Sequence, residues 1–182
     1  MKRLIWGLCS LPLLAILILA YFLGPLSPEF LSWQIAITGY CAAGLLAICL
    51  ILPPLHKIFP SIALFTTLKR YQKQIGLSVF YYALIHGTTF FVNRKITTGS
   101  YDWIYFFHPV IIPGVVALFI LFLLSVTSNK YSKKMLNYKR WKNLHRFVYV
   151  AEACVFLHMV FQGGKTLLWG CAIFIPLILC QF

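Results

Sequence analysis

The chain has 182 residues, of which 61% are hydrophobic and only 10% are charged, and its mean hydropathy is +0.85. Soluble domains carry about a quarter charged residues, so this composition excludes an ordinary water-soluble fold and predicts an integral membrane protein surrounded by lipid. The net charge of +13 would indicate nucleic-acid binding only as a basic face on a soluble module, so we expect no nucleic-acid partner.

Six cysteines lie within apolar stretches, and none forms a CxxC pair or another metal-ligand spacing. Buried cysteines usually behave as small apolar side chains. We therefore expect neither a disulfide framework nor a cysteine metal site.

Six apolar segments predict an all-α, six-transmembrane-helix bundle that forms a single domain over residues 1–182, since about 20 helical residues cross a bilayer core. The first segment, 4–23, follows a basic start that also resembles a signal peptide. We expect a retained helix, because no small-x-small cleavage site follows it. The second, 31–52, is expected to end at Pro53 and Pro54. The remaining spans are 75–92, 109–127, 144–161 and 166–180. Residues 62–68 are expected to lie along the membrane interface, and residues 93–108 and 129–142 to be polar loops.

Lys and Arg residues are concentrated on one side of the membrane when the six spans are traced from a cytoplasmic N-terminus. Of sixteen, only Arg94, Lys95 and Lys165 fall on the outer side. The positive-inside rule therefore predicts that both termini are cytoplasmic. The basic loop 130–142 could dock an acidic reductase, although we favour ordinary positive-inside charge as its explanation.

Two histidines lie at matched depths on two predicted spans that run outward. His86 is eleven residues into the third span and His158 fourteen residues into the fifth, so both lie in the outer half of the bilayer. Such a pair could ligate one heme iron from opposite faces, with the heme between the third and fifth helices. The alternative is that each ring only hydrogen-bonds to a neighbouring helix. We favour metal ligation, because an imidazole without a partner in lipid is costly.

His145 opens the fifth span at the inner boundary. It lies thirteen residues before His158, about 20 Å along a helix and about 140° around it. The two side chains would therefore serve different sites, and His145 could ligate a second heme near the cytoplasmic face. At that depth the third span offers Gln72 and Lys73 rather than histidine, so spacing alone favours one bis-histidine heme over two.

Three further ionisable residues have weaker indications. Glu152 is the acid within a span; it could relay protons or hydrogen-bond a histidine, or it could be a neutral carboxyl group. His56 and His108 lie beside prolines at predicted span ends, and we expect both to be interfacial.

Residues 124–128 (LSVTS), the basic segment and residues 141–149 (WKNLHRFVY), with His158 downstream, resemble the ferric reductase-like transmembrane family. Within it, the chain looks most like the heme-binding membrane subunit of bacterial periplasmic methionine sulfoxide reductase systems. Residues 76–86, the pair Thr38 and Gly39, and Pro53 also fit. The resemblance covers about residues 35–162.

The resemblance implies a b-type cytochrome in the bacterial inner membrane, the electron-transfer component of a transmembrane oxidoreductase, with His86, His145 and His158 as heme ligands. It would carry electrons from a cytoplasmic flavoprotein or membrane quinol to a periplasmic acceptor, either a partner reductase or ferric iron. Larger relatives have a second histidine at the inner end of the third helix, where this chain has Gln72 and Lys73. One heme or two, a bound FMN and the oligomeric state are left open. A transporter or an assembly factor without redox activity is the alternative.

Overall fold

The computed structural model describes residues 2–100 and 103–181 as helices joined by turns, with no β-strand in these two ranges. The chain divides into two compact units whose boundary falls between Trp103 and Ile104. The all-α prediction is confirmed. The prediction of a single domain stays a prediction.

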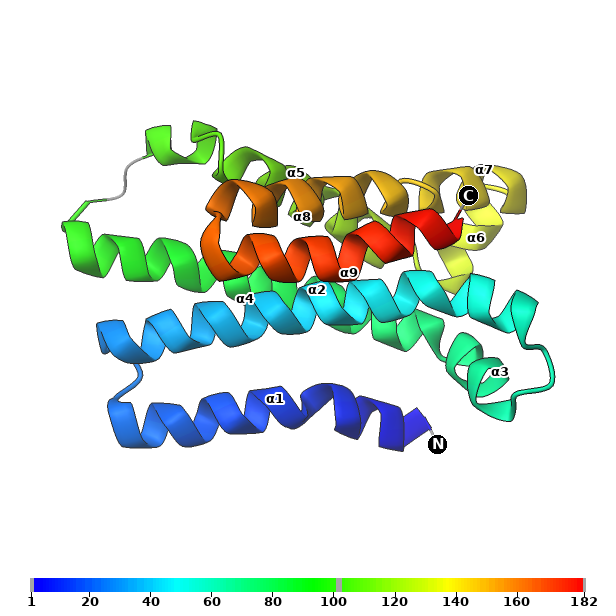
Figure 1. Ribbon diagram of the computed structural model, residues 1–182, viewed down its shortest axis with the longest axis horizontal. Coiled ribbons are helices and arrows are strands. Elements are labelled where there is room, and N and C mark those ends of the chain that lie inside the picture. Colours follow the sequence, from blue (N-terminus) through cyan, green and yellow to red (C-terminus); the bar gives the residue numbers. More distant parts are fainter. Residues whose placement is uncertain (1, 101–102, 182) are drawn as a thin grey trace. The chain divides into compact units, whose positions relative to one another are not determined.

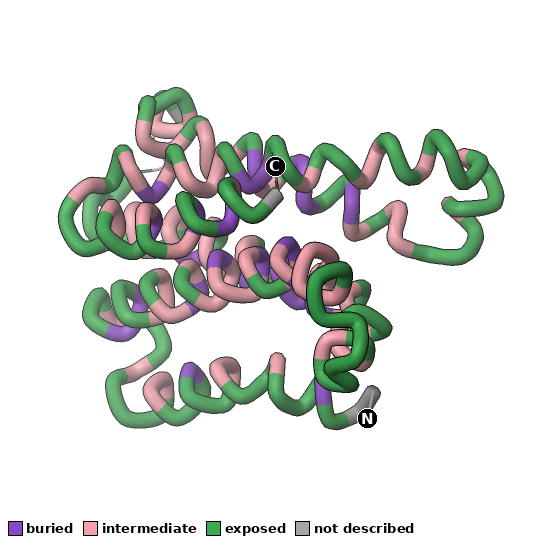
Figure 2. The backbone as a smooth tube through the Cα atoms, turned by 45° about the vertical axis from the view of Figure 1, so that its right-hand side comes forward, coloured by how far each residue is buried: buried purple, intermediate pink, exposed green. Residues whose placement is uncertain are grey.

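The first unit contains four helices, with α2 at its centre. They are α1 (Lys2–Leu23), α2 (Pro28–Ile58), α3 (Ala63–Arg70) and α4 (Gln72–Thr98). The other three helices all pack against α2 (Figure 1). Buried positions are concentrated along α2 and α4, whereas α1 is exposed over most of its length (Figure 2). The best-buried side chains of this unit are those of Thr38, Leu46, Leu52 and Val79.

The start of α2 is fixed by a local cap. Gly24 has a φ of 80°, a left-handed conformation that glycine adopts without steric cost, and it turns the chain after α1. Ser27 then accepts a hydrogen bond from the Phe30 N–H at 3.2 Å, and Pro28 occupies the first helical turn, where its missing N–H costs nothing.

The prediction that Pro53 and Pro54 end the second helix is wrong, because α2 continues through both prolines to Ile58. A proline cannot donate to the carbonyl four residues earlier, which for Pro53 is that of Cys49. The side chain of Gln72 on α4 replaces the missing donor, with its Nε2 2.8 Å from the Cys49 oxygen. A neighbouring helix therefore satisfies the freed carbonyl, which is how transmembrane helices tolerate proline.

Helix α1 is joined to α4 by a partly buried hydrogen bond. The hydroxyl of Tyr82, which is 2% exposed, donates to the carbonyl oxygen of Cys9 at 2.5 Å. Four residues before Cys9 on α1, Ile5 packs with Leu52 and Ile75 in one apolar cluster.

The prediction of a loop over residues 93–108 is wrong for its first part. Helix α4 runs to Thr98 and ends at Gly99, which has a φ of 76° and whose N–H donates to the Lys95 carbonyl at 2.8 Å. Residues 103–107 form the 3₁₀-helix η1 (Trp103–Phe107).

The second unit is built around α8. Its helices are α5 (Ile111–Val126), α6 (Lys130–Met135), α7 (Tyr138–His145), α8 (Val148–Gln162) and α9 (Gly164–Gln181). Both α5 and α9 pack against α8. Gly170 on α9 lies close to α8, since an added Cβ would be 3.1 Å from the Cβ of Met159.

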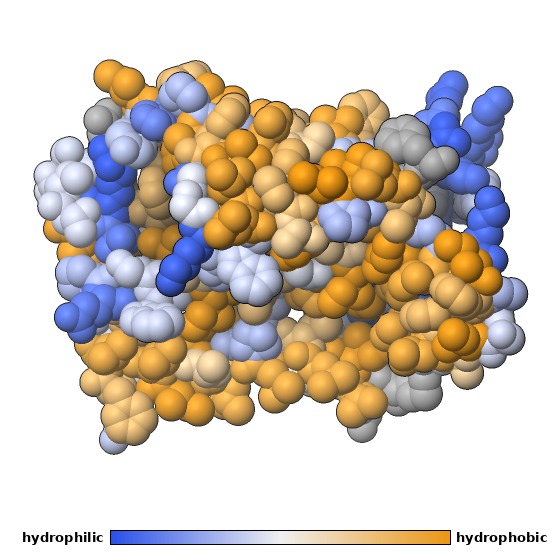
Figure 3. Space-filling model, viewed as in Figure 1, coloured by the Kyte–Doolittle hydropathy of each residue, from blue (hydrophilic) through white to orange (hydrophobic). Residues whose placement is uncertain are grey.

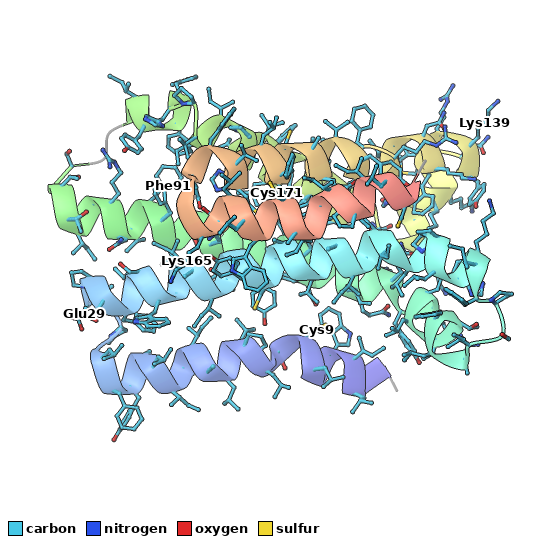
Figure 4. All side chains as sticks on the ribbon, in the orientation of Figure 1. Cys9, Glu29, Phe91, Lys139, Lys165 and Cys171 are labelled. Atoms are coloured by element: carbon cyan, nitrogen blue, oxygen red, sulfur yellow. The ribbon has the colours of Figure 1, made fainter. Side chains whose placement is uncertain are left out.

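The basic segment predicted as a loop over residues 129–142 is instead largely helical. Asn129 caps α6 by accepting from the Ser132 N–H at 2.7 Å, and Asn137 caps α7 by accepting from the Lys139 N–H at 3.4 Å. Lys139 projects away from α7 (Figure 4). Hydrophilic residues gather around these two short helices (Figure 3).

The predicted fifth span, 144–161, is divided by a tight turn directly after His145. The N–H of Phe147 bonds to the Leu144 carbonyl and that of Tyr149 to the Arg146 carbonyl, both at 3.1 Å and both over three residues rather than four. Such turns are wound more tightly than an α-helix. The ideal-helix angle predicted between His145 and His158 therefore does not apply.

Four segments of the described ranges are long and apolar enough to cross a membrane, and α5 and α9 are shorter apolar helices. Many large apolar side chains are exposed on these helices, such as Leu17 at 66% and Phe22 at 75%. Apolar residues cover the visible face of α1 (Figure 3). The chain is thus a multi-pass membrane protein, and the count of six spans stays a prediction. The four long segments are Leu4–Leu23, Pro28–Ile58, Gln72–Thr98 and Tyr138–Gln162.

Candidate functional site

His86 lies on α4 and turns its imidazole ring against the backbone of α2. Its Nδ1 is 2.8 Å from the carbonyl oxygen of Ile35. Because a carbonyl can only accept, Nδ1 carries the proton in this bond, and in the neutral ring the lone pair is then on Nε2. The hydrogen bond thus selects the tautomer in which Nε2 can bind a metal.

The ring can reach this carbonyl because residue 39 is glycine. A Cβ added to Gly39 would lie 2.9 Å from Nδ1 of His86, a distance that real Cβ atoms essentially never show, and 3.0 Å from Cε1. Beside it, the fully buried Thr38 donates its hydroxyl to the Gln34 carbonyl at 2.6 Å and so needs no partner outside its own helix.

His158 on α8 repeats this arrangement within the second unit. Its Nδ1 is 2.7 Å from the carbonyl oxygen of Val110, the residue that precedes α5. A Cβ added to Gly114 would lie 3.1 Å from Nδ1 and 3.2 Å from Cε1 of the ring. The Nε2 of Gln162 lies 3.0 Å from the Nε2 of His158. A side-chain amide N–H donates, so this contact agrees with a lone pair on the Nε2 of His158.

His145 at the end of α7 is in a different environment. Its Nε2 lies 3.3 Å from the hydroxyl of Thr127, which donates its own hydrogen to the Leu123 carbonyl at 2.7 Å. The imidazole is then the donor, and Nε2 carries the proton. The ring also lies on Trp141, with ring centres 4.1 Å apart, and the Trp141 Nε1 donates to the Thr127 carbonyl at 3.0 Å. His145 is thus part of a closed cluster with Thr127 and Trp141.

The other predicted polar residues are spread over both units. His56 lies near the end of α2, with its Nδ1 3.5 Å from the Thr66 hydroxyl. His108 is exposed, stacks on Tyr105, and accepts from the Val110 N–H through Nδ1 at 3.3 Å. Glu152 is 2% exposed on α8.

Within residues 2–100 and 103–181, no group of three or more His, Cys, Asp or Glu side chains is arranged to hold a metal ion. The donors are therefore single imidazoles on separate helices. Such a set suits the axial positions of a heme iron, whose other four ligands come from the porphyrin, better than the four protein ligands of a structural zinc site. His86 and His158 fit this role through the Nε2 lone pair that their backbone hydrogen bonds select.

Sequence reasoning found the histidines but missed their partners. Gly39 was included only as part of the family resemblance, and neither Gly114, Gln162 nor Thr127 was given a role. A glycine in a helix otherwise built of bulky apolar residues is a usable signal of close approach, yet it does not reveal which side chain approaches.

Comparison with known proteins places these residues in a wider group. The family model described as "Ferric reductase like transmembrane component" matches residues 38–156, more than half of the chain. The match contains His86 and His145 and ends shortly before His158. No solved structure matches the chain.

Curated relatives match a shorter stretch. The protein-methionine-sulfoxide reductase heme-binding subunits MsrQ of Brucella ovis, Brucella canis and Brucella suis are each 37% identical over 95 residues. This stretch covers 52% of the chain and spans 43% of each relative's own length.

Proposed function

The chain belongs to the ferric reductase-like transmembrane family, and we propose that it is a b-type cytochrome that transfers electrons across the bacterial inner membrane. In this proposal His86 and His158 would hold one heme, each through its Nε2. The electrons come from a cytoplasmic flavoprotein or membrane quinol and go to a periplasmic acceptor, either a partner reductase or ferric iron. The chain is then the electron-transfer component of a transmembrane oxidoreductase.

The observation that carries the proposal is the pair of bonds from the Nδ1 of His86 and His158 to backbone carbonyls. A histidine that ligates a metal almost always donates its other ring N–H to a carbonyl, a carboxylate or water, which fixes the tautomer and raises the basicity of the ligating nitrogen. His86 and His158, which the sequence predicts at matched depths in the membrane, both form this bond from Nδ1 to a carbonyl. His108, which is exposed, instead uses Nδ1 as an acceptor.

In this proposal the protein orients the two histidine rings and provides the surroundings of the heme. When bound, heme supplies a one-electron iron couple inside the membrane. The backbone of α2 orients the ring of His86, and the residue preceding α5 orients that of His158. Both histidines lie on apolar helices, and the polarity and solvent exposure around a heme are among the protein's means of setting its potential.

The Brucella relatives are named as heme-binding subunits, which supports heme as the cofactor. That name also motivates a partner methionine sulfoxide reductase as one candidate acceptor. A second heme ligated by His145 stays a prediction: in its contact with Thr127 the Nε2 of His145 carries the proton, whereas the Nε2 of His158 accepts from Gln162.

Transfer across a bilayer tests the proposal. The purified protein is incorporated into liposomes that enclose ferricyanide, and dithionite is added outside; neither ion crosses a lipid bilayer readily. We expect the enclosed ferricyanide to be reduced only when the protein is present, and reduction to stop in His86→Ala and His158→Ala. If heme-loaded protein in sealed liposomes reduces no ferricyanide, the electron-transfer function is wrong and a transporter or an assembly factor becomes the better interpretation.

A further inference from the structure

The two candidate ligands share one backbone arrangement. His86 donates to the carbonyl of residue 35 and lies against residue 39; His158 donates to the carbonyl of residue 110 and lies against residue 114. In both units the glycine follows the accepting carbonyl by four positions. The two packing helices differ otherwise in sequence and length.

Helix geometry explains the spacing of four. The carbonyl of residue n points along the helix axis toward the N–H of residue n+4, so its oxygen lies next to the backbone of that residue. In the two contacts described here, the imidazole that donates to this oxygen also lies where a Cβ of residue n+4 would project. Glycine, which has no Cβ, leaves that surface open to the ring.

The distances show how little space is left. The three atoms nearest to a Cβ built on Gly39 are all in the His86 ring, and the three nearest to one on Gly114 are all in the His158 ring. By contrast, a Cβ on Gly44, also on α2, would have no atom within 4 Å, and one on Gly170 would meet Met159. The close approaches at residues 39 and 114 are thus specific to the two histidines.

We propose that Gly39 and Gly114 are positioning residues, each of which admits an imidazole to the carbonyl four residues earlier and thereby fixes Nε2 as its ligating nitrogen. The ligand part rests on the proposed function; the contact between glycine and ring does not. An alanine at either position pushes the ring away and lengthens the Nδ1–carbonyl bond. A weaker bond makes Nε2 a poorer donor to ferric iron, so the midpoint potential becomes more positive.

The first test is a double-mutant cycle on thermal unfolding of the detergent-purified protein. We expect Gly39→Ala to lower the unfolding midpoint in the wild-type background and to have no such effect in a His86→Ala background, where the ring is absent. Gly114→Ala should behave in the same way with His158→Ala. Gly170→Ala is the matched control for the second pair, because its loss should persist in His158→Ala. Equal losses in both backgrounds for Gly39→Ala and Gly114→Ala overturn the proposal.

The second test is a redox titration of the heme signal. Gly39→Ala and Gly114→Ala are expected to bind less heme or to show a more positive midpoint potential, whereas Gly44→Ala matches the wild type. Wild-type heme content with an unchanged or more negative potential in both variants overturns the role of the glycines while leaving the cytochrome intact. If the wild type binds no heme, the proposed function fails, and the unfolding cycle still decides whether each glycine positions its ring.

Discussion

The imidazole of His86 and the carbonyl of Ile35 lie 2.8 Å apart, Nδ1 to oxygen, across the contact between α4 and α2. This bond places the ring proton on the nitrogen that faces protein backbone and leaves the lone pair on Nε2. His158 forms the equivalent bond to Val110 within the other unit. In two helix pairs of different sequence, a backbone carbonyl thus holds the proton on Nδ1 of a histidine. A role in packing alone would not require the same bond in both units.

The contact between Gln72 and Cys49 should be essential only because residue 53 is proline. Gln72→Leu keeps the side-chain volume but leaves the buried Cys49 carbonyl without its donor. We expect a loss of about 1–2 kcal/mol in the free energy of unfolding. In a Pro53→Ala background residue 53 regains its N–H, and the same substitution should cost much less.

Chemical or detergent unfolding of the four proteins measures this coupling. Gln74→Leu on the same helix is the control, since the Oε1 of Gln74 has no hydrogen-bond partner among the described residues. Equal losses for Gln72→Leu in both backgrounds would show that the amide does not replace the proline's missing donor.

Tyr82→Phe should loosen α1 without disturbing the candidate ligands. The substitution removes the donor to the Cys9 carbonyl and keeps the ring. Side-chain hydrogen bonds in membrane proteins contribute about 0.6 kcal/mol on average, so we expect a small drop in the unfolding midpoint. The heme absorption spectrum should be unchanged. A lost or shifted heme signal would place Tyr82 in the cofactor site instead.

The purified protein should contain one heme per chain. The Nε2 of His145 is bound to Thr127, its ring lies on Trp141, and Gln72 on the third predicted span is bound to Cys49. A pyridine hemochrome assay against protein concentration measures the ratio. His145→Ala should keep this heme. A ratio of two in the wild type, falling to one in His145→Ala, would instead establish the predicted inner heme.

Two lysines of the second unit should face opposite sides of the membrane. The positive-inside pattern places Lys139 in the cytoplasm and Lys165, at the start of α9, outside; both are labelled in Figure 4. In a background without native cysteines, Lys165→Cys should react with a membrane-impermeant maleimide in spheroplasts, and Lys139→Cys only after lysis. The reverse labelling pattern would show that the topology is inverted. Labelling of both cysteines in spheroplasts would contradict a membrane span between residues 139 and 165.

The sequence was sufficient for the helical architecture, because lipid leaves little choice but helices for apolar runs of this length. It also singled out His86 and His158, which both donate Nδ1–H to a backbone carbonyl, while their pairing around one heme stays a prediction. It failed at Pro53: the rule that proline ends a helix holds where nothing else can bind the freed carbonyl, and Gln72, 23 residues from Cys49, supplies that bond.

Other features depend on contacts that sequence does not contain. Gly39 and Gly44 both lie on α2, yet only one lies against a ring. The turn at Arg146 and Phe147 has no proline or glycine to indicate it, so the fifth predicted span looked continuous. Which nitrogen of a histidine carries the proton is decided by the group opposite, and that group is 51 residues away for His86 and 48 for His158.

The most direct measurement is the dithionite-reduced minus oxidised absorption spectrum of the detergent-purified protein, recorded for the wild type, His86→Ala, His158→Ala and the exposed-histidine control His108→Ala. If His86 and His158 are the two axial ligands, the wild type and His108→Ala show the same b-type bands, and each of the other variants loses or strongly weakens them. Bands of wild-type size in both His86→Ala and His158→Ala would contradict the assignment. A folded wild-type protein supplied with heme that shows no bands would contradict the cytochrome itself.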